Sequence, residues 1–268
     1  MKKWLFISTV VVGLTLGGCE EDKLNIFSVQ DDVEMGQQVV DEIKANTSEY
    51  PILGRSDYPE AYSYLENIRN KLLATGELKY ADTFDWDLYI IDQDVLNAFS
   101  LPGGTTFYYT GLLKYLDNEA SLAGVMAHEF AHADKRHATT IMTKEYGFSS
   151  LLSMILGDDA GLAQTIAAEL ALGATNLKFS RDNEYEADEC AVEYLYATDY
   201  DARGVAYFFE KLIAAEEEND DPNWLVYFKT HPNPDDRVTE IYGKYEALGS
   251  KSGFLYATEY KDFKAFLP

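Results

Sequence analysis

His128-Glu129-Phe130-Ala131-His132 is the stretch of this sequence that decides its fold and its chemistry. In a helix, positions four apart lie on the same face, so His128 and His132 can offer two imidazole nitrogens to one metal ion. Glu129 lies beside them, near the open coordination position and outside the set of ligands. The pattern predicts a zinc ion whose bound water loses a proton to Glu129. Such pentads also occur by chance, so the rest of the site has to be found elsewhere in the chain.

A third ligand is expected downstream, because catalytic zinc sites use three protein ligands and leave the fourth position to water. Residues 183–188 read Asn-Glu-Tyr-Glu-Ala-Asp within a helical pattern. Glu184 is predicted to be the third ligand. Asp188 lies one turn later on the same face, where it can accept a hydrogen bond from the outer nitrogen of a ligating histidine. The alternative is a solvated acidic helix face, and Glu186, which points elsewhere, is the weaker ligand candidate.

Helical and strand patterns surround these motifs. Alternating apolar residues over 86–90, and a Pro-Gly-Gly turn signal inside 95–109, predict a hairpin or two adjacent strands. Asn118 is a suitable cap for the helix that carries the zinc motif. The sequence therefore predicts an α+β fold that is mostly helical, with a small sheet packed on the active-site helix. Helical spacing is seen over 33–43, 59–73, 118–136, 140–156, 161–172, 181–196, 202–217 and 235–248.

Composition indicates a globular protein that does not bind nucleic acid. The chain has 268 residues, of which 47% are hydrophobic and 14% aromatic, enough for one substantial domain or two small ones. Its formal net charge of -24 and its scattered lysines and arginines would repel a phosphate backbone. The acidity is interpreted as a solvated surface, and a preference for basic substrates is the alternative.

The first residues have the pattern of a bacterial lipoprotein signal. Two lysines precede an apolar run over 4–16 that is too short to span a bilayer, and residues 16–19 read Leu-Gly-Gly-Cys. This pattern predicts a signal peptide over 1–18, a lipid on Cys19 and a tether over 19–32. An ordinary secretory signal or an uncleaved anchor is the alternative.

Cysteine usage agrees with this prediction. The chain has only two cysteines, so a lipid on Cys19 leaves Cys190 without a disulfide partner. Cys190 lies in a predicted helix that is rich in small apolar residues. We therefore expect it to be a small buried hydrophobic residue rather than a nucleophile.

The sequence resembles the gluzincin metallopeptidases that include the CAAX prenyl endopeptidase and the heat-shock membrane protease (peptidase family M48). Two further segments match that family: residues 97–104, Asn-Ala-Phe-Ser-Leu-Pro-Gly-Gly, look like its strand before the active-site helix, and His231-Pro232 followed by Arg237 looks like its late His-Pro segment. The resemblance covers most of 33–248. It implies a zincin-like metallopeptidase domain over 33–250, a C-terminal extension over 251–268 and one Zn²⁺ per chain.

The resemblance also implies roles for the matching residues. His231 would lie near the zinc and stabilise the oxyanion, or block the metal in a resting state. A structural histidine in a turn is the alternative. Arg237 would pair with an acid near the site, unless it is an ordinary surface arginine. Apart from the resemblance, His137 lies just past the zinc motif, and we expect it at the surface or at a helix end rather than as a metal ligand. An edge strand would pair with an extended substrate backbone through Asn97, Ala98, Phe99, Ser100 and Leu101.

The function that follows is a zinc metalloendopeptidase of the small bacterial lipoprotein type. The resemblance implies that it hydrolyses unfolded or misassembled proteins, and the Cys19 lipid would hold it in the cell envelope, at the periplasmic face of the outer membrane or at the cell surface. The competing hypothesis is a latent or non-proteolytic envelope chaperone or assembly factor that keeps a bound zinc.

Overall fold

The computed structural model describes residue 25 and residues 27–172, 178–218, 227, 229, 231 and 236–268. The predicted signal peptide over 1–18, the predicted lipidation site Cys19 and Pro232 lie outside these residues. Within the described part of the chain, no helix combines the length and the apolar character needed to cross a membrane.

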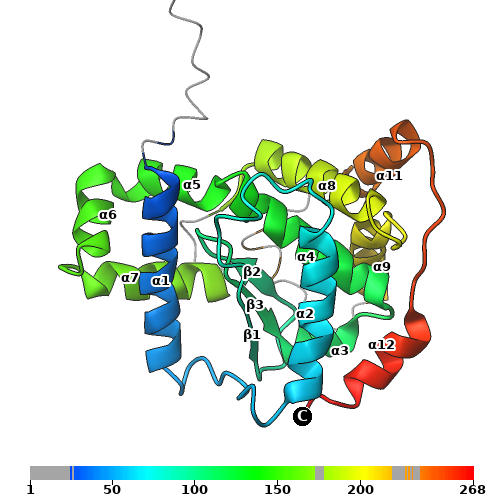
Figure 1. Cartoon of the computed structure of the whole chain (residues 1–268), viewed down its shortest axis with the longest axis horizontal. Helices are drawn as coiled ribbons and strands as arrows, with labels where there is room; N and C mark the ends of the chain where they lie inside the picture. The colour runs from blue at the N-terminus through cyan, green and yellow to red at the C-terminus, as the bar shows by residue number, and fades with distance from the viewer. Residues whose placement is uncertain are drawn as a thin grey trace, which may run out of the picture.

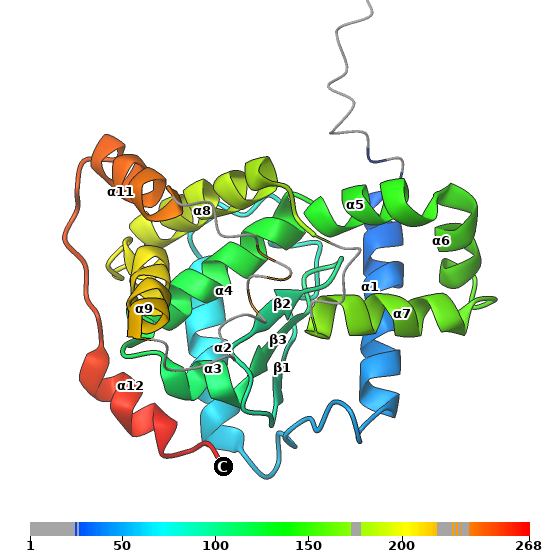
Figure 2. The ribbon, with the colours of Figure 1, turned by 180° about the vertical axis from the view of Figure 1, so that it is seen from behind.

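Helices surround a small three-stranded sheet (Figures 1 and 2), which confirms the predicted α+β, mostly helical class. The strands are β1 (Leu88–Ile91), β2 (Ala98–Ser100) and β3 (Thr106–Tyr109). The helices are α1 (Val29–Ala45), α2 (Pro59–Leu73), α3 (Thr110–Tyr115), α4 (Glu119–Asp134), α5 (His137–Tyr146), α6 (Phe148–Ile155), α7 (Ala160–Leu172), α8 (Arg181–Tyr196), α9 (Gly204–Glu218), α11 (Arg237–Ala247) and α12 (Ala257–Lys264).

The sheet has the strand order β1-β3-β2, with β1 parallel and β2 antiparallel to β3. The predicted turn joins β2 to β3, and its Gly103 and Gly104 have φ values of 80° and 91°, which glycine adopts without strain. The first strand begins at Leu88, two residues later than the alternation predicted. Trp86 has a φ of 48°, outside the extended region, so the strand cannot include it.

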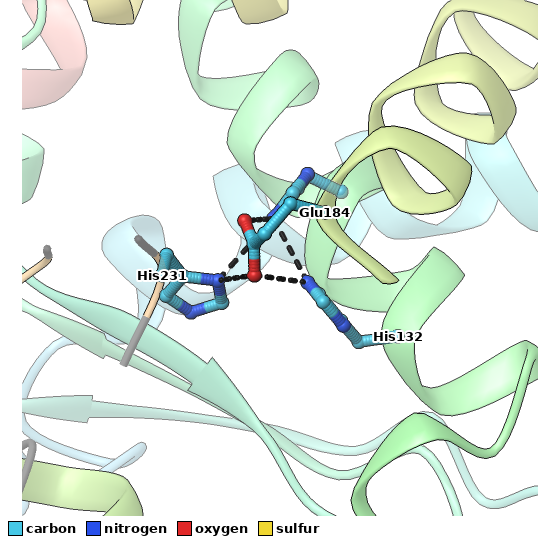
Figure 3. Close-up of side chains that lie close together, drawn as sticks. His132, Glu184 and His231 are labelled. Carbon is cyan, nitrogen blue, oxygen red and sulfur yellow. Dashed lines mark hydrogen bonds and ion pairs between the residues drawn. The ribbon is translucent and has the colours of Figure 1, made fainter. Parts of the chain in front are cut away.

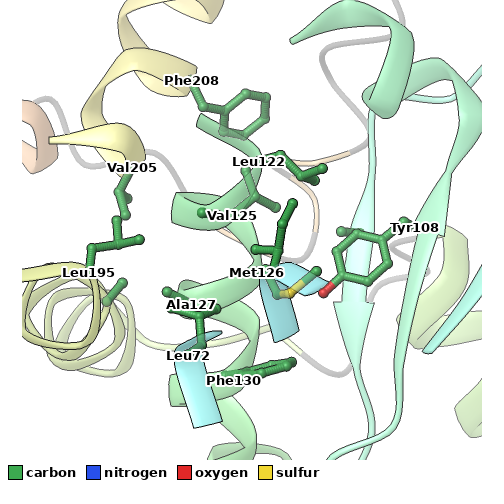
Figure 4. Packing of buried hydrophobic residues seen from close by; sticks show 14 of the residues in the cluster. Leu72, Tyr108, Leu122, Val125, Met126, Ala127, Phe130, Leu195, Val205 and Phe208 are labelled. Atoms are coloured by element: carbon green, nitrogen blue, oxygen red, sulfur yellow. The ribbon is translucent and has the colours of Figure 1, made fainter. Parts of the chain in front are cut away.

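Helix α4 carries the zinc motif through the centre of the molecule, and all of its residues are buried. The side chain of Asn118 accepts a hydrogen bond from the Ser121 N–H and caps the helix, as predicted. Helices α8 and α9 pack on α4, where Leu195 and Phe208 approach it (Figure 4). Strand β2 also lies against α4. A methyl group on Gly124 would lie 2.4 Å from the Val205 nitrogen, so α4 and α9 approach more closely than any larger residue would allow. Apolar packing from several elements therefore fixes the position of the motif.

A second apolar cluster joins α1 to α6 and α7 on the other side of the sheet. The helix predicted over 140–156 is two helices, because Gly147 has a φ of 75° and ends α5 before α6 begins. The segment predicted as a C-terminal extension forms α12. Its Tyr260 and Phe263 are buried in the main core, and the Phe263 ring stacks on Tyr64 at 4.3 Å between centroids.

Candidate metal centre

Two helices bring the predicted ligands together. His128 and His132 lie in the last two turns of α4, and Glu184 lies in the first turn of α8. Ser180 and Asn183 form a capping box that fixes where α8 begins, and so sets the position of Glu184. The acidic face of α8 is therefore divided: Glu184 and Asp188 are buried against α4, whereas Glu189 faces solvent.

The donor atoms of His128, His132, Glu184 and His231 lie within 4.8 Å of one another, and all four residues are buried. The two Nε2 atoms of His128 and His132 are 3.0 Å apart, and each lies 3.5 Å from an oxygen of Glu184. His231 Nδ1 approaches the same carboxylate at 3.2 Å (Figure 3). Imidazole nitrogens and one carboxylate are donors that zinc accepts in catalytic sites, so the residues present fit the predicted ion.

Burial and opposing charges set the ionisation of this cluster. Burial alone would raise the pKa of Glu184, but His231 and Arg237 hold it well below its ordinary value. Burial would lower the pKa of His128, but hydrogen bonds with Asp188 and Glu184 raise it to about 9. Burial and the neighbouring His128 charge keep the pKa of His132 well below its ordinary value. Glu184 is therefore held as a carboxylate that could bind a metal, and His128 would have to lose its proton to serve as a ligand.

The outer nitrogen of His128 faces Asp188, whereas the sequence left open which ligating histidine Asp188 would meet. His128 Nδ1 lies 2.8 Å from Asp188 Oδ1. Arg237 binds both oxygens of Asp188 at 2.6 Å and reaches Glu184 at 2.8 Å through its remaining nitrogen. The side chain of Arg237 is fully buried, so the alternative of an ordinary surface arginine was wrong. Although burial opposes it, Arg237 holds the pKa of Asp188 below its ordinary value.

The outer nitrogen of His132 has a partner that the sequence reasoning missed. His137 begins α5, so the expectation of a helix end was right, but the residue is buried rather than at the surface. Its Nδ1 lies 2.9 Å from His132 Nδ1, and its Nε2 lies 3.3 Å from Glu186. The chain has only four histidines, and the structure places all of them in this cluster. That scarcity was the available signal.

The side chains of Glu129 and His231 face one another beside the potential metal donors. His231 Nε2 lies 3.5 Å from a Glu129 oxygen, and burial raises the pKa of Glu129 above its ordinary value. The imidazole of His231 stacks on the Tyr227 ring, with centroids 4.6 Å apart. A buried carboxylate with a raised pKa is suited to accept and return a proton.

The predicted substrate strand β2 lies at one edge of the sheet, because among the described strands it pairs with β3 alone. The Tyr109 N–H donates to the Asn97 carbonyl and the Leu101 N–H to the Thr105 carbonyl. In an antiparallel ladder this register turns the backbone groups of Ala98 and Ser100 away from β3. Phe99 stacks on a ring of β3, and the side-chain amide of Asn97 donates to the Ala171 carbonyl at 3.1 Å, so its side chain is occupied by a structural contact.

Comparisons with known proteins agree with this site. The family model described as peptidase family M48 matches residues 59–244. The chain is 25% identical over 223 residues to the beta-barrel assembly-enhancing protease of Yersinia pestis, covering 80% of this chain and 44% of that protein. It is 30% identical over 192 residues to the putative protein of the same name from Vibrio cholerae, covering 68% and 38%. It is also 27% identical over 223 residues to the mitochondrial metalloendopeptidase OMA1 of Schizosaccharomyces pombe, covering 82% and 62%. The chain thus spans less than two thirds of each of these relatives.

Proposed function

The chain belongs to peptidase family M48, and on this premise we propose that it is a lipid-anchored endopeptidase that degrades unfolded or misassembled proteins of the bacterial cell envelope. The family assignment confirms the resemblance seen in the sequence and, together with the buried donor set, the expected zinc metallopeptidase class. The lipid on Cys19, the signal peptide over 1–18, the tether over 19–32 and the domain over 33–250 belong to this proposal.

The observation that carries the proposal is a set of metal donors with a buried carboxylate beside it. We assign His128, His132 and Glu184 as the residues that hold zinc. When bound, zinc polarises the scissile carbonyl and brings the pKa of a bound water to about 7. Glu129 takes the proton from the attacking water and passes it to the leaving nitrogen. His231 donates a hydrogen bond that stabilises the oxyanion.

Substrate binding is assigned to the edge strand β2. The backbone groups that Ala98 and Ser100 turn away from β3 would pair with an extended peptide. Pairing through the backbone depends little on the side chains of the substrate, which suits a peptidase that acts on many unfolded chains. The names of the bacterial relatives, which refer to beta-barrel assembly, support substrates of this kind.

The test is Glu129→Gln. We expect the variant to bind one zinc per chain and to lose at least about 100-fold in cleavage of unfolded casein, the lower bound for general-base catalysis. Glu240→Gln is the matched control, because Glu240 is an exposed glutamate on α11 and is not among the metal donors. Cleavage at the parent rate by a zinc-replete Glu129→Gln protein would refute the assignment.

The latent alternative rests on the position of His231. Its Nδ1 lies 3.4 Å from His128 Nε2 and belongs to the group of potential metal donors, so it can occupy the fourth coordination position. His231→Ala separates the possibilities. A blocking histidine predicts faster casein cleavage by the variant, and an oxyanion donor predicts slower cleavage. If the parent protein and the His231→Ala variant both hold zinc but show no chelator-sensitive cleavage, the chaperone hypothesis replaces the protease hypothesis.

A further inference from the structure

Helix α6 exposes an apolar stripe at one end of the molecule. The side chains of Phe148, Leu152 and Leu156 are 48%, 37% and 68% exposed, and Leu156 is the residue that directly follows the helix. Their spacing of four residues puts them on one face, and the opposite face buries Leu151 and Met154 against the second apolar cluster. The helix carries no charged residue. Exposed apolar side chains along one face of a helix can bury in the boundary region of a lipid layer.

The stripe lies where the N-terminal part of the chain meets the fold. The rings of Phe27 and Phe148 are 5.3 Å apart between centroids. Phe27 follows Cys19 by eight positions in the sequence, a span of at most about 28 Å. Figures 1 and 2 show α6 beside the first turns of α1, with α12 at the far side of the molecule. A lipid on Cys19 would therefore hold the bilayer surface within reach of α6.

We propose that Phe148, Leu152 and Leu156 dock into the lipid surface to which Cys19 is anchored, so that the enzyme has a fixed orientation on the membrane. The proposal rests on the lipid anchor in the proposed function. A lipid anchor keeps the local concentration of lipid high, so a small apolar contact is sufficient to orient the protein. The net charge of -24 gives no attraction to anionic lipid, so we expect docking on neutral phosphatidylcholine that salt does not weaken.

The test uses the lipidated full chain in phosphatidylcholine vesicles. A fluorophore is attached at Leu156→Cys or, as a matched control, at Phe266→Cys. Phe266 is 44% exposed and comes two residues after the end of α12, the helix on the far side of the molecule (Figure 1). Cys190 is buried and an acylated Cys19 is blocked, so the new cysteine reacts selectively. We expect a nitroxide lipid to quench the label at 156 at least about threefold more than the label at 266, since an interfacial helix enters about 5–10 Å into the bilayer surface.

Each outcome decides between anchor and docking. Equal quenching at both positions in an acylated protein overturns the docking surface and leaves the anchor intact. If mass spectrometry finds Cys19 unmodified, the labels are measured in a Cys19→Ser background. Stronger quenching at 156 than at 266 then supports the docking surface and overturns the lipid anchor. Equal quenching at the two positions overturns both the docking surface and the anchor. Concentration-dependent shielding of the 156 label from an aqueous quencher, without quenching by lipid, assigns the stripe to a second copy of the chain and overturns the proposal.

Discussion

His128 and His132 lie one turn apart on α4, yet their outer nitrogens meet different surroundings. His128 faces Asp188, which is held by a buried bidentate arginine. His132 faces His137, a neutral or positive ring rather than a carboxylate, and that ring leads to Glu186. The side chain of Glu186 is 39% exposed, whereas those of Asp188 and Arg237 are almost completely buried.

The difference shows that the two ligand histidines are held with different rigidity. A buried carboxylate and guanidinium fix the orientation of one ring and raise its basicity. A histidine partner fixes only the tautomer. With His132 Nε2 on a metal, the Nδ1–H of His132 would donate to His137 Nδ1, and the proton on His137 Nε2 would face Glu186. We expect the first arrangement to dominate stability and zinc affinity and the second to tune them, and the following variants test that order.

The largest effect is expected from Arg237→Ala. It leaves the carboxylates of Asp188 and Glu184 buried without their cation, and breaking a buried pair in this way costs about 3–5 kcal/mol of unfolding free energy. Urea denaturation measures the loss. Lys244→Ala on the same helix is the control, because its pair with Glu193 is partly exposed and is expected to contribute under about 1 kcal/mol. Equal losses in the two variants would remove the distinction between the two surroundings.

Asp188→Asn is expected to have the next largest effect. The variant keeps the side-chain shape but removes the charge that orients His128, and loss of such a partner lowers metal affinity by about 10–100-fold. We expect a value near the upper end, because Asp188 is buried. Competition with a chromophoric chelator gives the zinc affinity. Glu189→Gln, the exposed neighbour on α8, should leave it unchanged.

The sequence predicted the His128 side of this comparison and missed the His132 side, for a physical reason. Glu184 and Asp188 lie four apart on one helix, so the geometry of a single helix placed them together. His137 follows a break in the chain: α4 ends at Asp134, and Arg136 adopts a left-handed φ of 60° before α5 begins. The direction in which a new helix turns is a tertiary outcome, and no local periodicity contains it.

The same limit applies to the fold. The bounds of α2 and α8 followed from their own periodicity and matched the structure. The break at Gly147 was missed, because a glycine within an apolar helical pattern does not reveal its φ. The packing of the predicted C-terminal extension was missed as well. Tyr260 and Phe263 become core residues only because α2 and α4 offer them a surface, which depends on packing across most of the chain.

His137→Ala is expected to weaken zinc binding by about 10-fold, the lower end of the range for such partners. The buried Nδ1–H of His132 loses its acceptor in the variant, but no charge is stranded. His137→Gln supplies an amide oxygen at a similar place, and we expect it to restore most of the affinity. A purely structural role predicts the reverse pattern, in which both variants lose unfolding free energy and zinc affinity follows that loss.

The smallest effect is expected from Glu186→Gln. The amide still accepts a hydrogen bond from His137 Nε2, and the lost charge was partly exposed. Exposed pairs of this kind contribute about 0.2–1 kcal/mol, so zinc affinity should fall by less than about fivefold and the loss should shrink as salt is added. A loss as large as that of Asp188→Asn would mean that the charge of Glu186 acts through His137 on the metal. The two ligand histidines would then be equivalent, with a carboxylate behind each, and the comparison would fail.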